Sequence, residues 1–179
     1  MALKATIFKA DLQVSDMDRH YYQEHSLVIA RHPSETDERM MVRLLAFALY
    51  ADEALEFGKG ISDEDEPGLW RKDLTGAVQC WIEVGLPDEK RVKKACHRAA
   101  QVIVLTYGGR AAEIWRQQNA NALARHGNLT ILNLPETASG PLAALSQRTM
   151  RLQCLVQDGQ VWLSDEQNRV EVTPERWQG

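Results

Sequence analysis

The stretch DLTGAVQCWIEVGLPDEKRVKK, residues 73–94, decides the fold because it joins an apolar strand to a charged helix. Residues 78–84 have the apolar character of a strand, and residues 75–76 mark a turn between this strand and a shorter one before it. Pro87 is typical of a helix start, and the helix is predicted to run to about residue 100. The stretch therefore predicts a β-hairpin followed by a helix.

Strands and helices continue to alternate after this stretch. The run QVIVLTYG (101–108) is uninterrupted and apolar, as in a strand buried on both faces. A helix over residues 110–125 and a strand at LTILNLP (129–135) follow. The order strand, helix, strand, helix, strand predicts right-handed crossovers and a largely parallel sheet.

Both ends of the chain are predicted to be β-structure. Residues 6–14 alternate between two faces, and residues 20–31 return as a second strand of an N-terminal hairpin. Near the C-terminus, the pair Asp158-Gly159 is a strong hairpin signal between two alternating strands. We expect the terminal segments, residues 1–31 and 148–177, to pair with each other as β additions that form a second sheet beside the α/β core.

The first convincing helix of the chain begins near Ser34, which is predicted to be its N-cap. Glu38 follows the spacing i, i+3, i+7 with Met41 and Leu45, so it is expected at the N-terminal end of the core-facing side. Arg43 is expected to point away from that side. Alternatively, Glu38 is a first-turn acid that the helix dipole favours.

Composition and charge exclude several classes of protein. With 179 residues, 44% hydrophobic and 26% charged, the chain is expected to form one globular domain over residues 1–179. The net charge of −4 gives no overall basic surface, so binding to nucleic acid would need local positive charge. No apolar run approaches the roughly 18 residues of a membrane span, and the N-terminus lacks a signal-peptide core. We therefore expect a cytoplasmic monomer with no membrane partner.

The cysteines and histidines do not form a metal-binding pattern. Cys80, Cys96 and Cys154 are scattered through apolar segments and make no CxxC motif, so we expect buried, reduced thiols. The five histidines are dispersed and make no HExxH motif, which disfavours a zinc site.

Carboxylates offer a different candidate site. Alternation along residues 78–84 places Glu83 on the face opposite Cys80 and Ile82, and Asp73 precedes Glu83 by ten residues across the turn. The hairpin is expected to bring the two carboxylates to one end of the sheet. Their repulsion would be relieved by an oxygen-preferring cation, Mg²⁺ or Mn²⁺, with Glu38 as a third acid. Alternatively, Glu83 is a strand-end acid facing water and Asp73 forms a turn.

The order of these elements is similar to the αβββαβ core of PD-(D/E)XK nucleases. The chain also resembles the YaeQ family from end to end, in the segments MALKATIFKA, ARHPSETDERMMVRLLAFALYADE, WIEVGLPDEKRVKKAC, RAAEIWRQQN and QDGQVWLSD. The resemblance implies a nuclease-like α/β core with a mixed sheet, to which the terminal β-hairpins add a second sheet. Carried over by position, it implies that Asp73, Glu83 and the carbonyl of Val84 hold the metal and that Glu38 is the acid of the first helix.

The sequence departs from the superfamily pattern at two positions. Lys72 stands in place of a proline, and Gly85 stands where a lysine is expected. That lysine normally orients the attacking water and offsets phosphate charge. In some superfamily members the lysine migrates to a neighbouring helix, and here Lys90, Lys93 and Lys94 follow. On a helical wheel Lys93 lies at the edge of the buried face, so the pair Lys93 and Lys94 is predicted to replace the lysine, with Lys93 first.

The cations of this helix, which include Arg91 and Arg98, have two interpretations. They form a solvated helix face, since Lys and Arg are good surface helix formers, or they form a basic patch that holds a phosphate backbone. The acidic loop SDEDEPG (62–68) argues against the second interpretation. Trp70 and Trp81 flank the region and either stack on bases or pack in the core.

Two functions follow from this sequence. The first is a metal-dependent nuclease acting on DNA or another nucleic acid, in which Mg²⁺ or Mn²⁺ lowers the pKa of a bound water and polarises the scissile phosphate. The second is a catalytically inactive nuclease-fold module that binds nucleic acid or protein, and the resemblance connects it with transcription elongation. The missing lysine and the acidic charge balance favour the second function. A nucleophilic hydrolase is a distant third because the sequence has no GxSxG motif.

Overall fold

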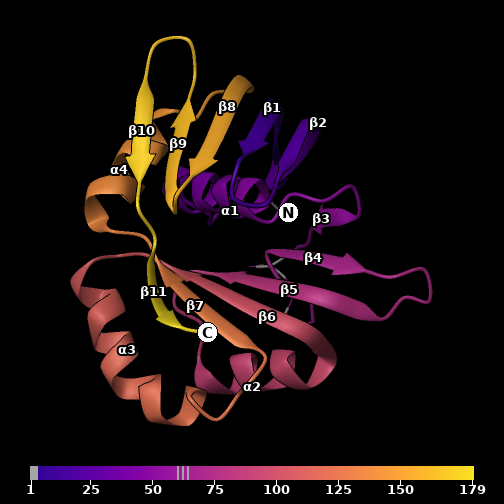
Figure 1. Ribbon diagram of the computed structural model, residues 1–179, viewed down its shortest axis with the longest axis vertical. Coiled ribbons are helices and arrows are strands. Elements are labelled where there is room, and N and C mark those ends of the chain that lie inside the picture. Colours follow the sequence, from indigo (N-terminus) through magenta and orange to yellow (C-terminus); the bar gives the residue numbers. More distant parts are fainter. Residues whose placement is uncertain (1–3, 60, 62, 64) are drawn as a thin grey trace. The chain divides into compact units, whose positions relative to one another are not determined.

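The computed structural model describes residues 4–59, 61, 63 and 65–179. In this part of the chain the fold is mixed α/β, with two β-sheets and four α-helices (Figure 1). The chain divides into two compact units, Met1–Ala51 with Thr137–Pro174 and Asp52–Glu136 with Glu175–Gly179. Each unit contains one of the sheets, so the prediction of an α/β fold with a second sheet is confirmed.

The first unit is built on a five-stranded sheet in the order β10-β9-β8-β1-β2. β1 and β2 form the predicted N-terminal hairpin, and β1 pairs in parallel with β8. β8, β9 and β10 continue the sheet by antiparallel pairing. The terminal segments therefore pair with each other as predicted. Their bounds are β1 Thr6–Asp16, β2 Tyr21–Arg31, β8 Thr149–Gln157, β9 Gln160–Ser164 and β10 Arg169–Val172.

One face of the five-stranded sheet is buried, and the opposite face is largely exposed. The alternation predicted for residues 6–14 is observed, since the even-numbered residues 8–14 are buried, whereas Lys9, Asp11 and Gln13 are exposed. Helix α1 (Asp37–Leu49) contacts β1 in this unit (Figure 1). The period of two along each strand thus separates an apolar inner face from a polar outer face.

The start of α1 differs from the prediction. Its N-cap is Thr36, whose hydroxyl accepts a hydrogen bond from the backbone N–H of Arg39 at 3.1 Å. Ser34 instead lies in a turn, where its hydroxyl is 2.6 Å from Nδ1 of His32. The prediction that Ser34 caps the helix is therefore wrong. The hydroxyl of Ser34 contacts the imidazole of His32, and the N-cap lies two residues further along the chain, at Thr36.

Burial around α1 is more complete than an amphipathic stripe predicts, since every residue from Met40 to Ala48 is buried. This includes Arg43, which was expected to point away from the core. Its guanidinium donates to both carboxylate oxygens of Glu35, at 2.9 and 2.6 Å, and to the carbonyl of Ala30 at 3.1 Å. Burial lowers the pKa of Arg43, and the charge of Glu35 opposes this shift. The inward position of Arg43 thus depends on a carboxylate that the helical pattern alone does not indicate.

The second unit is built on a six-stranded sheet in the order β11-β7-β6-β5-β4-β3. β5, β6 and β7 are parallel and are joined by α2 and α3, as the predicted order of strands and helices requires, but the sheet as a whole is mixed because its outer strands pair antiparallel. β11 departs from the expectation for the C-terminal segment, because it pairs with β7 and not with the terminal strands. The strand bounds are β3 Leu55–Phe57, β4 Leu69–Lys72, β5 Val78–Val84, β6 Ala99–Thr106, β7 Leu129–Asn133 and β11 Glu175–Gln178.

Helices α2 (Glu89–Arg98) and α3 (Arg110–Leu123) cover one face of the six-stranded sheet (Figure 1). The core between them and the sheet includes Trp81, Trp115 and Ile131. A further helix, α4 (Glu136–Ala144), was not predicted, since its short sequence contains glycine and proline. No helix in the described part of the chain is long and apolar enough to cross a membrane.

The three cysteines are free and buried, as predicted. Burial raises the pKa of Cys80 and of Cys96 to about 11. It raises the pKa of Cys154 to about 12. A thiol with such a pKa carries almost no thiolate at neutral pH, so these cysteines pack as small apolar side chains and are not nucleophiles.

Candidate functional site

The two acids expected to share a metal lie at opposite ends of the β4–β5 hairpin. Lys72 pairs with Val78 beside the turn, whereas Leu69 pairs with Ile82 at the far end. Asp73 follows Lys72 into the turn, and Glu83 lies one residue beyond the far pair. At about 3.3 Å per residue, five strand positions separate the two acids by roughly 16 Å. The expectation that they meet is wrong, because an antiparallel hairpin brings together residues at equal distances from its turn.

Asp73 organises that turn. Its Oδ1 accepts hydrogen bonds from the backbone N–H of Thr75 at 2.8 Å, the hydroxyl of Thr75 at 2.5 Å and the N–H of Ala77 at 3.0 Å. Its Oδ2 accepts from the amide of Gln79 at 3.1 Å. The hydroxyl of Thr75 is the main cause of a lowered pKa for Asp73. Asp73 is therefore a turn former, which is the alternative that the sequence left open.

Glu83 is buried at the end of β5, with 3% of its surface exposed. Its Oε1 accepts one hydrogen bond from the indole N–H of Trp81 and another from Nε of Arg91, both at 2.8 Å. Because Trp81 and Glu83 alternate onto the same face of the strand, their side chains both point toward α2. Glu83 is therefore not a strand-end acid facing water. It is a buried carboxylate with an arginine as its charge partner.

Arg91 forms hydrogen bonds with other groups in addition to Glu83. Its backbone N–H donates to the carboxylate of Asp88, the N-cap of α2, at 2.8 Å. Its Nη2 donates to the carbonyl of Glu66 at 2.8 Å. The guanidinium thus connects the end of β5, the start of α2 and the loop before β4. Only 22% of the Arg91 side chain is exposed, compared with 4% for Glu83.

The sequence interpretation missed the role of Arg91, although the signal was present. Arg91 and Lys93 flank the buried Val92, so both lie about 100° from the centre of the buried face of α2. A helical wheel does not distinguish these two sides of the buried face, so it indicates Arg91 as much as Lys93. The long planar guanidinium of arginine suits a buried carboxylate better than an ammonium group does.

The predicted replacement lysines are exposed. Lys93 and Lys90 project from α2 into solvent. Lys94 forms an exposed ion pair with Asp65, with Nζ 2.8 Å from Oδ1. Arg98 donates to the backbone carbonyl of Asp65 at 3.2 Å. These positions fit the interpretation of a solvated helix face.

The acidic loop lies against the basic helix. The carboxylate of Asp65 accepts a hydrogen bond from Nζ of Lys94, and this bond is the main cause of the lowered pKa of Asp65. The backbone carbonyl of Glu66 accepts a hydrogen bond from Nη2 of Arg91. Part of the predicted loop, Ser62 and Glu64, lies outside the described residues. The ion pair of Asp65 with Lys94 neutralises part of the positive charge on α2, and the backbone carbonyl of Glu66 adds a hydrogen bond to Arg91.

Trp81 does not lie on an open surface. It is 2% exposed and packs edge-to-face on Trp70, with ring centroids 5.9 Å apart. Arg98 lies over the ring of Trp81 at 5.2 Å, and Nζ of Lys72 lies 3.8 Å from the centroid of Trp70. The core-packing interpretation is therefore correct for Trp81.

The remaining members of the predicted metal site are Val84 and Glu38, which belong to different units of the chain. Val84 is buried at the end of β5 beside Glu83. Glu38 is a half-buried residue in the first turn of α1, in the unit of the five-stranded sheet, whereas Asp73 and Glu83 belong to the other unit. Within the described residues, no three histidine, cysteine or acidic side chains are placed to hold a metal ion together. The participation of Glu38 stays a prediction.

Gly85 has a backbone conformation that suits glycine better than lysine. Its φ angle is +103°, which L side chains rarely adopt, and its N–H donates to the carbonyl of Leu105 at 3.0 Å. A Cβ built at Gly85 meets no atom within 4 Å, so a lysine would fit in space but would strain the backbone. The positive φ angle of Gly85 therefore agrees with the presence of glycine, and not lysine, at this position.

We expect Gly85→Ala to lower the free energy of unfolding by about 1–2 kcal/mol, the usual penalty of a left-handed conformation for a residue with a Cβ. Gly127→Ala is the matched control, because its Cβ would also meet open space and its φ lies outside the positive range. For the control, urea denaturation should show a free energy of unfolding within about 0.5 kcal/mol of the wild type. Equal losses in the two variants would contradict the assignment of strain to Gly85.

The family is decided by comparison with known proteins. A family model described as "YaeQ protein" matches residues 1–174. This chain belongs to the YaeQ family. The YaeQ protein of Escherichia coli (strain K12) is 49% identical over 178 residues, which cover 99% of this chain and 98% of that protein. The YaeQ protein of Salmonella typhi is 48% identical with the same coverage.

Two crystal structures of YaeQ proteins have the same mixed α/β fold. The YaeQ protein from Xanthomonas axonopodis pv. citri is 52% identical and superposes with a TM-score of 0.95, covering 98% of this chain and 99% of that chain. The YaeQ protein from Pseudomonas syringae is 37% identical with a TM-score of 0.94, covering 98% of this chain and 97% of that chain. The family resemblance predicted from the sequence is confirmed.

Proposed function

We propose that this YaeQ chain is a catalytically inactive nuclease-fold module that binds a macromolecular partner. The order α1-β3-β4-β5-α2-β6 is the αβββαβ order of the PD-(D/E)XK core, which supports the nuclease-like assignment. The observation that carries the proposal is the buried ion pair between Glu83 and Arg91. A protein cation contacts the carboxylate to which the superfamily pattern assigns a metal.

The residues implied for Mg²⁺ or Mn²⁺ do not fit such an ion. These cations bind several oxygen ligands at once, and Asp73 lies at the opposite end of the hairpin from Glu83. Asp73 also uses both carboxylate oxygens to hold its own turn. A divalent cation at Glu83 would meet the fixed positive charge of Arg91, which would repel it. The geometry therefore supports binding without metal-dependent cleavage.

A protein partner is better supported than a nucleic acid. Contacts to Asp65 and Glu66 engage three of the cations proposed for phosphate binding: Arg91, Lys94 and Arg98. Trp81 is buried and unavailable to stack on bases. The net charge of −4 adds a general repulsion toward nucleic acid. A protein partner is also compatible with the transcription-elongation role that the family resemblance implies, and three free thiols suit a cytoplasmic location.

The proposal is tested by incubating the wild-type protein and its Glu83→Gln variant with single- and double-stranded DNA in Mg²⁺ or Mn²⁺. We expect both proteins to leave the DNA intact, and an Mn²⁺ titration to give no tryptophan fluorescence change that depends on Glu83. Asp73→Asn serves as a second variant, because asparagine can still form the turn. Metal-dependent cleavage by the wild type that Glu83→Gln abolishes would overturn the proposal and support the nuclease hypothesis.

A further inference from the structure

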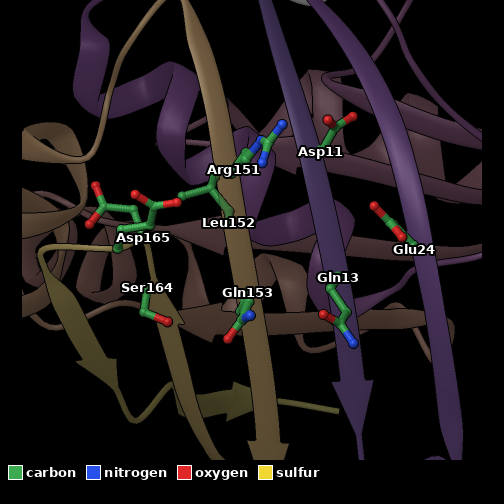
Figure 2. Close-up of a pocket in the computed structure, with 9 residues that line it drawn as sticks. Asp11, Gln13, Glu24, Arg151, Leu152, Gln153, Ser164 and Asp165 are labelled. Atoms are coloured by element: carbon green, nitrogen blue, oxygen red, sulfur yellow. The ribbon is translucent and has the colours of Figure 1, made fainter.

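The outer face of the five-stranded sheet is hollowed into a groove. The groove has a volume of about 560 Å³ and crosses β2, β1 and β8 to the turn that follows β9. Figure 2 shows Gln13 and Gln153 side by side in it, Glu24 on one side and Asp165 on the other. We call this surface the outer groove. Its lining belongs to one unit of the chain, so the groove is complete within that unit.

The floor of the outer groove is a row of polar side chains on paired strands. Glu24 pairs with Gln13, Gln13 with Gln153, and Gln153 with Ser164. Gln13, Gln153 and Ser164 also line a neighbouring hollow of about 440 Å³, which continues to Trp162. The two hollows therefore share part of this row, and the neighbouring hollow contains a cation, Arg169, in its lining.

The charge of the outer groove is predominantly negative. Asp11 and Glu24 lie on the β1–β2 side, Asp165 and Glu166 lie at the turn after β9, and Arg151 is the cation in the lining. The hydroxyl of Ser26 donates to Asp11 at 3.1 Å, and Asp165 accepts from backbone N–H groups of its own turn. Among the described residues, none of the four carboxylates takes part in a salt bridge. The groove thus presents acidic side chains on both sides of a neutral, hydrogen-bonding floor, and its cation Arg151 lies opposite Asp11 in the β1–β8 pairing.

We propose that the outer groove binds an extended, basic segment of a partner protein. Three strand spacings of about 4.8 Å separate β2 from β9, so the two acidic sides lie roughly 14 Å apart. An extended peptide advances about 3.3 Å per residue, and residues i and i+4 point to the same side. Two lysines or arginines four residues apart therefore reach Glu24 and Glu166 at the same time. The glutamines between them offer hydrogen bonds to the peptide backbone.

The chemistry of the lining selects this occupant over others. Carboxylates on both sides repel a phosphate backbone, which disfavours nucleic acid. The floor is made of amides and a hydroxyl, so an apolar helix would leave these polar groups without hydrogen bonds. The inference deepens the proposed binding role by naming a surface and a partner class. Its test is independent of the nuclease assay, because it involves neither Glu83 nor Arg91.

The test uses fluorescence polarisation with labelled, eight-residue synthetic peptides and the full-length protein. The probe peptide carries two lysines four residues apart in a Ser/Thr background, and a second peptide carries glutamates in their place. We expect the lysine peptide to bind and the glutamate peptide not to bind. The variant Glu24→Gln/Glu166→Gln should weaken binding of the lysine peptide about tenfold, as the loss of two exposed ion pairs predicts. Binding of the lysine peptide should also fall as salt is raised.

The matched control is Glu56→Gln/Glu113→Gln, which removes the same charge from exposed positions in the other unit and should leave the affinity unchanged. Equal weakening by the control, or an unchanged affinity in Glu24→Gln/Glu166→Gln, would overturn the proposal. Failure of the lysine peptide to bind the wild type would overturn it too, while the nuclease assay would still decide the proposed function separately. A labelled single-stranded oligonucleotide that binds the wild type and loses affinity in Glu24→Gln/Glu166→Gln would overturn the choice of a protein partner.

Discussion

Arg91→Met is expected to lower the free energy of unfolding by about 3 kcal/mol, because it leaves a buried carboxylate without its charge partner. The side chain of Glu83 is 4% exposed, so water cannot replace the guanidinium without opening the packing between β5 and α2. The indole N–H of Trp81 would remain as a donor, but a neutral donor does not offset a full charge. The loss would be measured by urea denaturation at pH 7.

Two further variants separate the ion pair from the packing of the arginine stem. Lys93→Met lies on the same helix at an exposed position and should change the stability by less than about 0.5 kcal/mol. The double variant Arg91→Met/Glu83→Gln removes both charges, keeps an acceptor for Trp81, and should recover part of the loss. A double variant that is less stable than Arg91→Met would show that the ion pair is not the source of the effect.

Glu35→Gln is the second variant for which we expect a large effect, also about 3 kcal/mol, because it leaves the buried guanidinium of Arg43 without a carboxylate. The side chains of Glu35 and Arg43 are 1% and 4% exposed. Burial disfavours the charged form of Arg43 and lowers its pKa, and the charge and hydrogen bonds of Glu35 oppose this shift. Arg39 also donates to the same carboxylate and would lose this partner.

Asp37→Asn is the control for this network. Asp37 forms an ion pair with Arg31, but its side chain is 49% exposed, so the change should cost no more than about 1 kcal/mol. The two variants would be compared by thermal and urea denaturation. A similar loss in both would mean that burial does not strengthen the Glu35 network, which is the physical basis of the prediction.

Local patterns in the sequence were sufficient for most of the fold. Residues 6–14 alternate because one face of their strand is buried, and the run 101–108 is apolar throughout because both faces of its strand are buried. Both patterns can be read from residue type alone. The hairpin at Asp158-Gly159 was predictable for the same local reason, since both residues have positive φ angles, 52° and 77°, as a two-residue turn of type I′ requires. Helix α4 and the pairing of β11 carried no comparable signal.

The candidate site was predicted less well than the fold. The sequence singled out Glu83 and the cations of the following helix, but it considered Lys93 and Lys94, whereas the cation that contacts Glu83 is Arg91. It also placed Asp73 beside Glu83, whereas the hairpin register separates them. Strand parity gives the face of a residue, but only pairing gives its neighbours across the sheet.

The sequence by itself determined the family, the strand and helix periodicities, and the burial of the three thiols, because each of these depends on residue type and local spacing. The tertiary structure decided which charges meet. Glu83 with Arg91, Glu35 with Arg43, and the acids of the outer groove come from different elements or from separate turns of one segment. The neighbours of a charged group in space decide whether it forms an ion pair or faces solvent. These neighbours are fixed only when strands pair and helices pack.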